Sequence, residues 1–183
     1  MRFADCPLLW RADRLVPMAL CRSLIADIEA GNPVPASSSR DYRDQDRIFR
    51  DDTGLAATLF ALLRPHLPDS IGGLSLVGLN ERLRLYRYRP GQRFLPHMDH
   101  WYEHSATRIS LLTVLVYLND DFEGGETRFM EQIEQTVTPA AGSAIVFQHK
   151  VRHEGCPVRR GTKYALRTDV MYEAERPVRL TLA

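Results

Sequence analysis

Residues 82–99 read RLRLYRYRPGQRFLPHMD, and the pattern of this stretch decides the fold class. From Arg82 to Tyr88, arginines alternate first with leucines and then with tyrosines, which is the period of an extended chain with two different faces. Pro90 and Gly91 then break the alternation, as turn residues do. The stretch therefore predicts a β-strand, a turn and a further extended segment that ends in a His-x-Asp pair.

The chain after residue 76 repeats this arrangement of short strands and turns. Residues 119–125 are rich in Asp and Gly and predict a turn. Short β-branched or apolar runs predict further strands at 111–118, 127–130, 135–138, 143–147 and 163–172.

The first part of the chain has the period of helices instead. Apolar residues recur at helical spacing from Leu20 to Ile28. A second helix is predicted to begin near Asp52 or Thr53, because both are good N-cap residues. Residues 32–50, between the two helices, are rich in proline, serine and charge and predict a loop.

Helices followed by many short strands favour a mainly β fold with N-terminal helices, such as a β-sandwich or jelly roll. The chain has 183 residues, of which 44% are hydrophobic, so a single domain with a substantial core is expected. We expect residues 1–75 to form a helical support region and residues 76–183 to form the jelly-roll core of one domain over residues 1–183.

The charge and cysteine content narrow the possible partners and compartments. The formal net charge of +1 gives no basic field, so we expect neither nucleic acid nor a membrane as a partner. The three cysteines form no C-x-x-C pair and favour a reducing compartment. Residues 1–20 mix charges among apolar residues and lack the pattern of a secretory signal, so we expect a cytoplasmic protein.

Two residues in the quoted stretch have the spacing of metal ligands. On a strand, His97 and Asp99 point to the same face, so an imidazole and a carboxylate converge. His153, from a later strand, is a candidate for a third ligand. Two histidines and one carboxylate form the facial triad of iron(II) oxygenases, which leaves three metal positions open. By itself the pair also fits a surface histidine beside a strand-end aspartate.

The surrounding motifs favour the metal site. They are YRPGQRFLPHMD at 88–99, YLNDDFEGGET at 117–127 and HEGCPVRRGTKY at 153–164. In this order and spacing, residues from about 80 to 172 resemble the catalytic domain of the Fe(II)/2-oxoglutarate-dependent dioxygenases, in the prolyl 4-hydroxylase branch. The resemblance implies a double-stranded β-helix (a jelly roll, cupin-like), with His97, Asp99 and His153 as catalytic iron ligands.

The same resemblance implies how a cosubstrate is bound. Lys163 matches the partner of the distal carboxylate of 2-oxoglutarate, and Tyr88 matches the tyrosine that hydrogen-bonds the same group. Thr113 and Thr127 match positions that line the cosubstrate pocket. A dicarboxylate inside a barrel needs a cation, because an unpaired buried anion is costly. The implied cofactors are Fe(II), 2-oxoglutarate and O2, with ascorbate in a supportive role.

The resemblance implies a hydroxylase that couples oxidative decarboxylation of 2-oxoglutarate, to succinate and CO2, with hydroxylation of a C–H bond. The substrate class stays open between a peptide, a free amino acid and a small metabolite. Prolyl hydroxylases of this branch tend to carry an arginine at the start of the central strand, where this chain has Ser110. Arg108 lies two residues earlier and could share the face of that position, so it is a candidate for substrate contact.

Strand alternation adds further candidates. If Lys163 faces the pocket, so do Arg167 and Asp169, and if Tyr88 faces it, so do Tyr86 and Arg84. These inward residues are candidates for substrate contact. The alternative for Arg167 is an internal ion pair with a carboxylate.

Two other functional classes remain open at this point. One is a cupin-like metal protein with a different reaction that does not use 2-oxoglutarate, and Lys163 and Tyr88 argue against it. The other is a non-catalytic binding module on the same barrel, which the retention of all three ligands argues against.

Overall fold

The computed structural model describes residues 3–177, and its elements confirm a mainly β fold with N-terminal helices. Helix α1 (Met18–Ala30) buries Cys21, Leu24 and Ile28 on one stripe. Helix α2 (Thr53–Leu63) begins at the N-cap Asp52, whose side chain accepts a hydrogen bond from the backbone N–H of Leu55 at 2.8 Å. A short 3-10 helix, η1 (Arg64–His66), follows α2.

Antiparallel strands form two main sheets and one small one. The large sheet has the order β1 (Leu9–Ala12), β12 (Ala144–Gln148), β8 (Arg108–Tyr117), β15 (Lys163–Glu173), β6 (Arg82–Tyr88), β3 (Asp46–Asp51) and β2 (Val34–Pro35). Beside it, β5 (Leu74–Leu79) pairs with β15 and with β4 (Ser70–Ile71). The second sheet has the order β11 (Gln135–Val137), β10 (Thr127–Phe129), β13 (His153–Gly155) and β7 (Phe94–His97). The small sheet pairs β14 (Val158–Arg160) with β9 (Glu123–Gly124).

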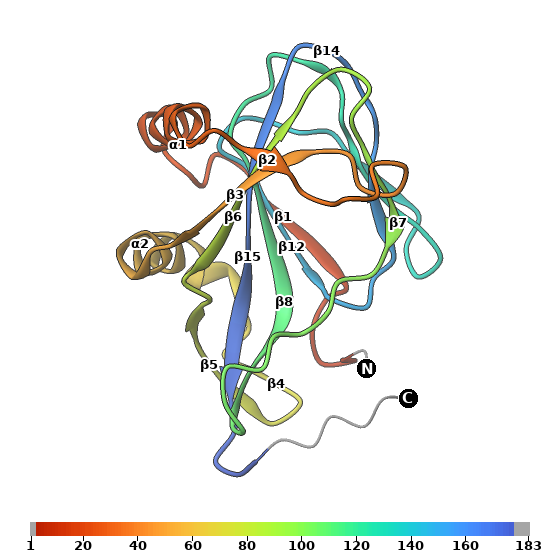
Figure 1. Cartoon of the computed structure of the whole chain (residues 1–183). Coiled ribbons are helices and arrows are strands. Elements are labelled where there is room, and N and C mark those ends of the chain that lie inside the picture. Colours follow the sequence, from red (N-terminus) through yellow and green to blue (C-terminus); the bar gives the residue numbers. More distant parts are fainter. Residues whose placement is uncertain (1–2, 178–183) are drawn as a thin grey trace.

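The two faces of the large sheet have different roles. Figure 1 shows α1 and α2 on one side of this sheet and strand β7 of the second sheet on the other. Leu83, Leu85 and Leu166 are fully buried in one cluster with the apolar stripes of both helices. The opposite face of β6 and β15 points toward the second sheet. The alternation of these strands thus separates a hydrophobic core from an interior that polar side chains line.

The N-terminal region contributes strands as well as helices. Residues 32–50 contain β2 and most of β3, although the sequence predicted a loop there, and β1 was also not predicted. Strand β3 pairs with β6 along its whole length and is flanked on its other side only by the short β2. Charged residues occupy both of its ends, at Asp46, Arg47, Arg50 and Asp51, so its sequence resembles a solvated segment. A division at residue 75 therefore does not separate a helical support from the sheet.

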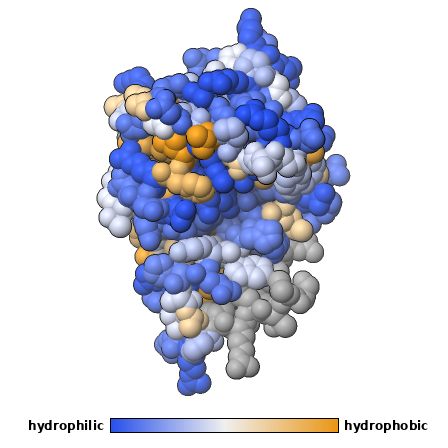
Figure 2. All heavy atoms as spheres, viewed as in Figure 1, coloured by the Kyte–Doolittle hydropathy of each residue, from blue (hydrophilic) through white to orange (hydrophobic). Residues whose placement is uncertain are grey.

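The hydropathy of the surface fits a fold whose apolar side chains pack between the helices and the large sheet. Figure 2 shows that hydrophilic residues dominate the viewed face and that hydrophobic ones gather in small groups. Within residues 3–177, neither helix is long and apolar enough to cross a bilayer.

Candidate metal centre and pocket

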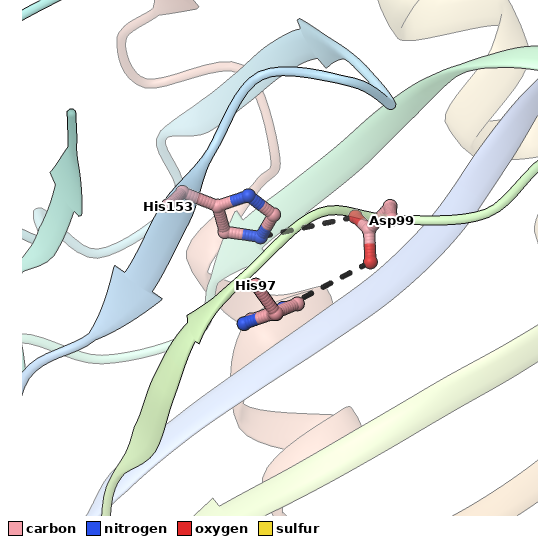
Figure 3. A group of neighbouring side chains, drawn as sticks. All are labelled: His97, Asp99 and His153. Atoms are coloured by element: carbon pink, nitrogen blue, oxygen red, sulfur yellow. Dashed lines mark ion pairs between the residues drawn. The ribbon is translucent and has the colours of Figure 1, made fainter. Parts of the chain in front are cut away.

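Two neighbouring strands of the second sheet bring three candidate ligands together. Strand β7 ends at His97, β13 begins at His153, and antiparallel pairing sets these two residues opposite each other. One ligand atom from each of His97, Asp99 and His153 lies within 4.8 Å of the others. Figure 3 shows the three side chains facing one another. The Nε2 atoms of His97 and His153 lie 4.0 and 3.9 Å from the two carboxylate oxygens of Asp99.

A backbone carbonyl fixes the orientation of each imidazole. The Nδ1 atom of His97 is 2.8 Å from the carbonyl oxygen of Leu95, and that of His153 is 2.9 Å from the carbonyl oxygen of Val151. Because a carbonyl only accepts, Nδ1 carries the proton and the Nε2 lone pair is free to bind a metal. Burial, and next the neighbouring His153, lowers the pKa of His97 to about 3. Burial also lowers the pKa of His153, so both rings are in the neutral, metal-binding form.

The carboxylate of Asp99 is buried and held at both oxygens. The hydroxyl of Thr113 donates to Oδ2 at 2.6 Å, and Nη2 of Arg167 lies 3.1 Å from Oδ1. The backbone N–H of Asp99 donates to the carbonyl of His149 at 2.8 Å. Burial would raise the pKa of Asp99, but Arg167 and the nearby histidines outweigh it and hold the pKa below its ordinary value. The carboxylate is therefore ionised and fixed in orientation.

Polar side chains behind this carboxylate form a continuous chain of contacts. Nη2 of Arg167 also lies 3.1 Å from one oxygen of Asp169, whose other oxygen is 3.1 Å from Nη1 of Arg84. Nδ1 of His149 hydrogen-bonds the hydroxyl of Thr113 at 2.9 Å. Arg167 thus makes the internal ion pairs that were the alternative to substrate contact. His149 contacts the metal site through Thr113 and lies outside the cluster of three ligands.

A cavity of about 270 Å³ lies beside the three ligands. Tyr42 and Met98 line it and are 44% and 41% exposed, so they mark its mouth. Lys163 and Tyr88 line it and are 3% and 7% exposed, so they mark its closed end. The three metal ligands also line this cavity.

Lys163 is a buried cation with no acidic partner among the residues that the structure describes. Its Nζ donates to the carbonyl oxygen of Gly125 at 2.6 Å and lies 5.1 Å from the centre of the Tyr88 ring. No ion pair among residues 3–177 includes Lys163. Burial lowers the pKa of Lys163 to about 8. A buried ammonium group with unused donors favours the binding of an anion at this end of the cavity.

The residues present fit Fe(II) together with a keto diacid. Two neutral imidazoles and one carboxylate on a single side form the ligand set that leaves positions open for other ligands. All three candidate ligands line the cavity, and Lys163 supplies a positive charge at its closed end. A molecule with a chelating group at one end and a carboxylate at the other complements both features.

The structure brings most of the predicted site residues to this cavity. Those that line it are His97, Asp99, His153, Tyr86, Tyr88, Thr113, Thr127, Lys163 and Arg167. Thr127 also accepts a hydrogen bond from the hydroxyl of Tyr117 at 2.7 Å.

Three predicted substrate residues do not line the cavity. Arg84 and Asp169 pair with each other beside it. Arg108, the first residue of β8, pairs with Glu173 at 3.2 Å. The position of Arg108 therefore gives no support to a role in substrate contact.

Sequence reasoning missed the residues that approach the cavity from the N-terminal region. Arg43 forms a β-bridge with Phe94, and the backbone N–H of Leu95 donates to the carbonyl of Tyr42 at 3.0 Å. Figure 1 shows this segment, between β2 and β3, reaching across to β7. The ring of Phe94 stacks on that of His97, with 3.5 Å between ring centres. No local pattern in residues 32–50 signals these long-range contacts.

Fold and site together define a jelly-roll protein with a centre of two histidines and one carboxylate. Residues 83–168 match the model of the family described as the 2OG-Fe(II) oxygenase superfamily. The matched segment includes all three candidate ligands and Lys163.

Curated proteins that are named as prolyl 4-hydroxylases are similar to this chain. It is 27% identical over 177 residues to "Probable prolyl 4-hydroxylase 6" of Arabidopsis thaliana, which covers 78% of this chain and 57% of that protein. It is 33% identical over 104 residues to "Putative prolyl 4-hydroxylase" of Acanthamoeba polyphaga mimivirus, covering 46% of this chain and 42% of that protein. The chain thus spans only about half the length of the curated relatives it matches.

Solved structures show the same fold. A Pseudomonas putida prolyl-4-hydroxylase matches with a TM-score of 0.69 and 21% identity, over 91% of this chain and 94% of that one. A Trichoplax adhaerens prolyl hydroxylase, solved with a hypoxia inducible factor peptide fragment, matches with a TM-score of 0.72 and 14% identity, over 89% and 83% of the two chains. These likenesses establish the double-stranded β-helix as the fold of this chain.

Proposed function

We propose that this protein is an Fe(II)- and 2-oxoglutarate-dependent hydroxylase. The observation that carries the proposal is the convergence of His97, Asp99 and His153 beside Lys163, a buried cation with no acidic partner among residues 3–177. The match of residues 83–168 to the model of the 2OG-Fe(II) oxygenase superfamily supports it.

Each residue has a distinct part in this proposal. The Nε2 atoms of both histidines and the carboxylate of Asp99 hold the metal. Lys163, with the hydroxyl of Tyr88, holds the distal carboxylate of 2-oxoglutarate, so that the keto acid lies along the closed half of the cavity. When bound, Fe(II) with 2-oxoglutarate and O2 supplies the oxidation of a substrate C–H bond, coupled to release of succinate and CO2.

The chain's own contribution is orientation and electrostatics. The carbonyls of Leu95 and Val151 keep the Nδ1 protons in place, and Thr113 with Arg167 keeps Asp99 from rotating. The buried walls exclude water from the closed half of the cavity, which strengthens the attraction of Lys163 for a carboxylate. The more exposed mouth is the side from which a substrate enters.

The substrate is a peptide or a small molecule. Peptidyl proline is one candidate, because the curated relatives are named as prolyl 4-hydroxylases. We also propose that ascorbate supports turnover, that the protein acts in the cytoplasm, and that residues 1–183 work as one catalytic domain.

The test is formation of succinate that depends on both Fe(II) and 2-oxoglutarate, accompanied by binding of 2-oxoglutarate to the Mn(II)-loaded protein. We expect His97→Ala to abolish succinate formation, since loss of a ligand costs more than the ~10–100-fold that loss of an outer-shell partner costs. His104→Ala, at an exposed histidine outside the cavity, is the matched control. Equal turnover by His97→Ala and the unmodified protein would refute the proposal.

A further inference from the structure

A group of arginines continues from the pocket mouth along the inner face of strands β3 and β6. Antiparallel register sets Arg47 opposite Tyr86 and Phe49 opposite Arg84, so these side chains share the face that lines the pocket. The Cζ atoms of Arg47 and Arg82 lie 4.4 and 4.7 Å from the centre of the Phe49 ring. We call the following residues the arginine strip: Arg43, Arg47, Arg82 and Arg84.

Arg43 joins this strip to the pocket itself. Its Nη2 donates to the hydroxyl of Tyr86 at 3.1 Å, and its Cζ lies 4.4 Å from the centre of the Phe94 ring. Its Nε is buried and has no hydrogen-bond partner among residues 3–177. The guanidinium group therefore lies at the pocket wall with unused hydrogen-bonding capacity.

The strip carries more positive charge than its surroundings neutralise. Among residues 3–177, Arg84 is the strip member that forms an ion pair, and its partner Asp169 is shared with Arg167. By register the nearest acid to Arg82 is the exposed Asp51, with which it forms no ion pair in this part of the chain. Like charges fixed on a rigid sheet repel, so an anion that binds among them is favoured.

The behaviour of Arg47 is consistent with this uncompensated charge. Burial, and next the nearby Arg43, lowers the pKa of Arg47, and Arg84 and Arg82 act in the same direction. The exposed ring of Phe49 gives the strip an apolar floor between the guanidinium groups. Such a surface suits a chain with acidic groups on a partly apolar backbone.

The position of the strip relative to the metal site indicates which molecule it binds. Lys163 lies opposite Tyr88 on β6, and Arg167, which contacts Asp99, lies opposite Arg84. Each two-residue step along a strand is about 6.6 Å. The strip therefore begins level with the metal ligands and extends away from the closed end that holds 2-oxoglutarate.

The size of the pocket also indicates that the arginine strip faces the substrate and not 2-oxoglutarate. Its volume of about 270 Å³ lies below the usual range of ligand pockets, roughly 300–1,000 Å³. It has to accommodate the keto acid and the reacting carbon of the substrate together. The rest of any larger substrate lies outside the mouth, where the arginine strip is the adjoining surface.

We propose that the substrate carries a carboxylate group outside its reacting part and that the arginine strip binds this carboxylate. The inference rests on the proposed function and adds the charge of the substrate to it. A guanidinium group matches a carboxylate through two parallel N–H···O bonds, which makes arginine the suitable side chain. The carboxylate belongs either to an acidic side chain of a peptide or to a free amino acid or other small acid.

The test compares probes that differ only in charge, with the protein loaded with Fe(II) and 2-oxoglutarate. One arm uses blocked short peptides with a varied central residue and flanking residues that are all Glu, all Gln or all Lys. The other arm uses free amino acids and their carboxamides. We expect the carboxylate forms to stimulate succinate formation about tenfold more than their amide counterparts, and the responding arm identifies the source of the carboxylate.

The double variant Arg47→Gln/Arg82→Gln is expected to lower kcat/KM for the responding carboxylate probe about tenfold and to reduce its dependence on ionic strength. The matched control Arg22→Gln/Arg128→Gln removes the same charge from exposed positions outside the strip. This control is expected to keep the preference for carboxylate probes over amide probes. Thermal unfolding of both double variants reports whether the fold is intact.

Two results overturn the inference. One is equal stimulation by carboxylate and amide probes, and the other is no stimulation by any carboxylate probe in either arm. Binding of 2-oxoglutarate to the Mn(II)-loaded unmodified protein separates this failure from failure of the proposed function. If 2-oxoglutarate binds and the charge preference is absent, the inference alone fails. If 2-oxoglutarate does not bind, both proposals fail.

Discussion

The closed end and the mouth of the pocket carry positive charge in different ways. At the closed end, Lys163 is a single buried cation between two strands, without an acidic partner among residues 3–177. At the mouth, several partly exposed arginines gather around aromatic rings. A buried charge acts through a low effective dielectric, whereas exposed charges are screened by water and salt. We therefore expect one substitution at the closed end to have a larger effect than one at the mouth.

The largest effect is expected for Lys163→Met, which keeps the length and the apolar stem of the side chain. The dissociation constant of 2-oxoglutarate should rise at least ~30-fold, because the distal carboxylate would be buried without a cation. Calorimetric titration of the Mn(II)-loaded protein measures this constant.

The matched control for this substitution is Lys150→Met. Lys150 is the only other lysine of the chain, and its Nζ lies 4.8 Å from the centre of the Trp101 ring, outside the pocket. Its substitution should leave the dissociation constant unchanged. Equal weakening in both variants would mean that Lys163 has no specific role and that the two ends of the pocket do not differ as proposed.

A smaller effect is expected for Arg167→Gln. Arg167 lies between the closed end and the mouth of the pocket. Arg167 contacts Asp99 at 3.1 Å and acts through it as a positioning residue. Loss of such an outer-shell partner should weaken Mn(II) binding ~10–100-fold, and Arg167→Lys should restore part of it. Electron paramagnetic resonance of free Mn(II) measures the affinity. If metal affinity stays the same while only the preference for carboxylate probes is lost, Arg167 belongs to the mouth.

The pH dependence of 2-oxoglutarate binding also distinguishes the closed end of the pocket from its mouth. The pKa of Lys163 is about 8 in the protein without ligand, so below that pH the lysine is charged and its attraction for the dianion is complete. Above it, binding requires uptake of a proton, and the dissociation constant of 2-oxoglutarate should rise about tenfold per pH unit. Lys163→Met should remove this rise. A rise that persists in the variant would assign it to another group.

The two ends also differ in how well the sequence predicted them. Tyr88 and Lys163 lie on strands with clear alternation, and matching motifs surround both of them and His97, so their faces and neighbours could be inferred. Lys163 does pair with Tyr88 across β15 and β6. The mouth depends on contacts between residues far apart in the chain, such as the bridge between Arg43 and Phe94. No local period encodes such contacts.

Strand β3 shows the same limit in physical terms. Its segment, Asp46–Asp51, is rich in charge, so its local propensity favoured a loop. On the side away from β6, the strand is flanked only by the short β2. Pairing with β6 stabilises it as a strand and gives its arginines a fixed position. Arg167 is an intermediate case, since alternation predicted its face but could not decide between a substrate and Asp99 as its partner.

The smallest effect is expected from Tyr86→Phe, and the matched variant is Tyr88→Phe. The two tyrosines lie two residues apart on the same face of β6, and both line the pocket. The hydroxyl of Tyr86 accepts a hydrogen bond from Arg43 at 3.1 Å, whereas Tyr88 lies beside Lys163. Loss of one hydrogen bond corresponds to a change of roughly 2- to 10-fold.

We expect Tyr86→Phe to raise KM for the responding carboxylate probe by that factor and to leave the dissociation constant of 2-oxoglutarate unchanged. Tyr88→Phe should do the opposite, raising the dissociation constant of 2-oxoglutarate with little change in probe KM. Steady-state kinetics and calorimetry on the same preparations separate the two quantities. If both variants change the same quantity, the boundary between cosubstrate and substrate does not lie between these two residues, and the arginine strip loses its link to the pocket.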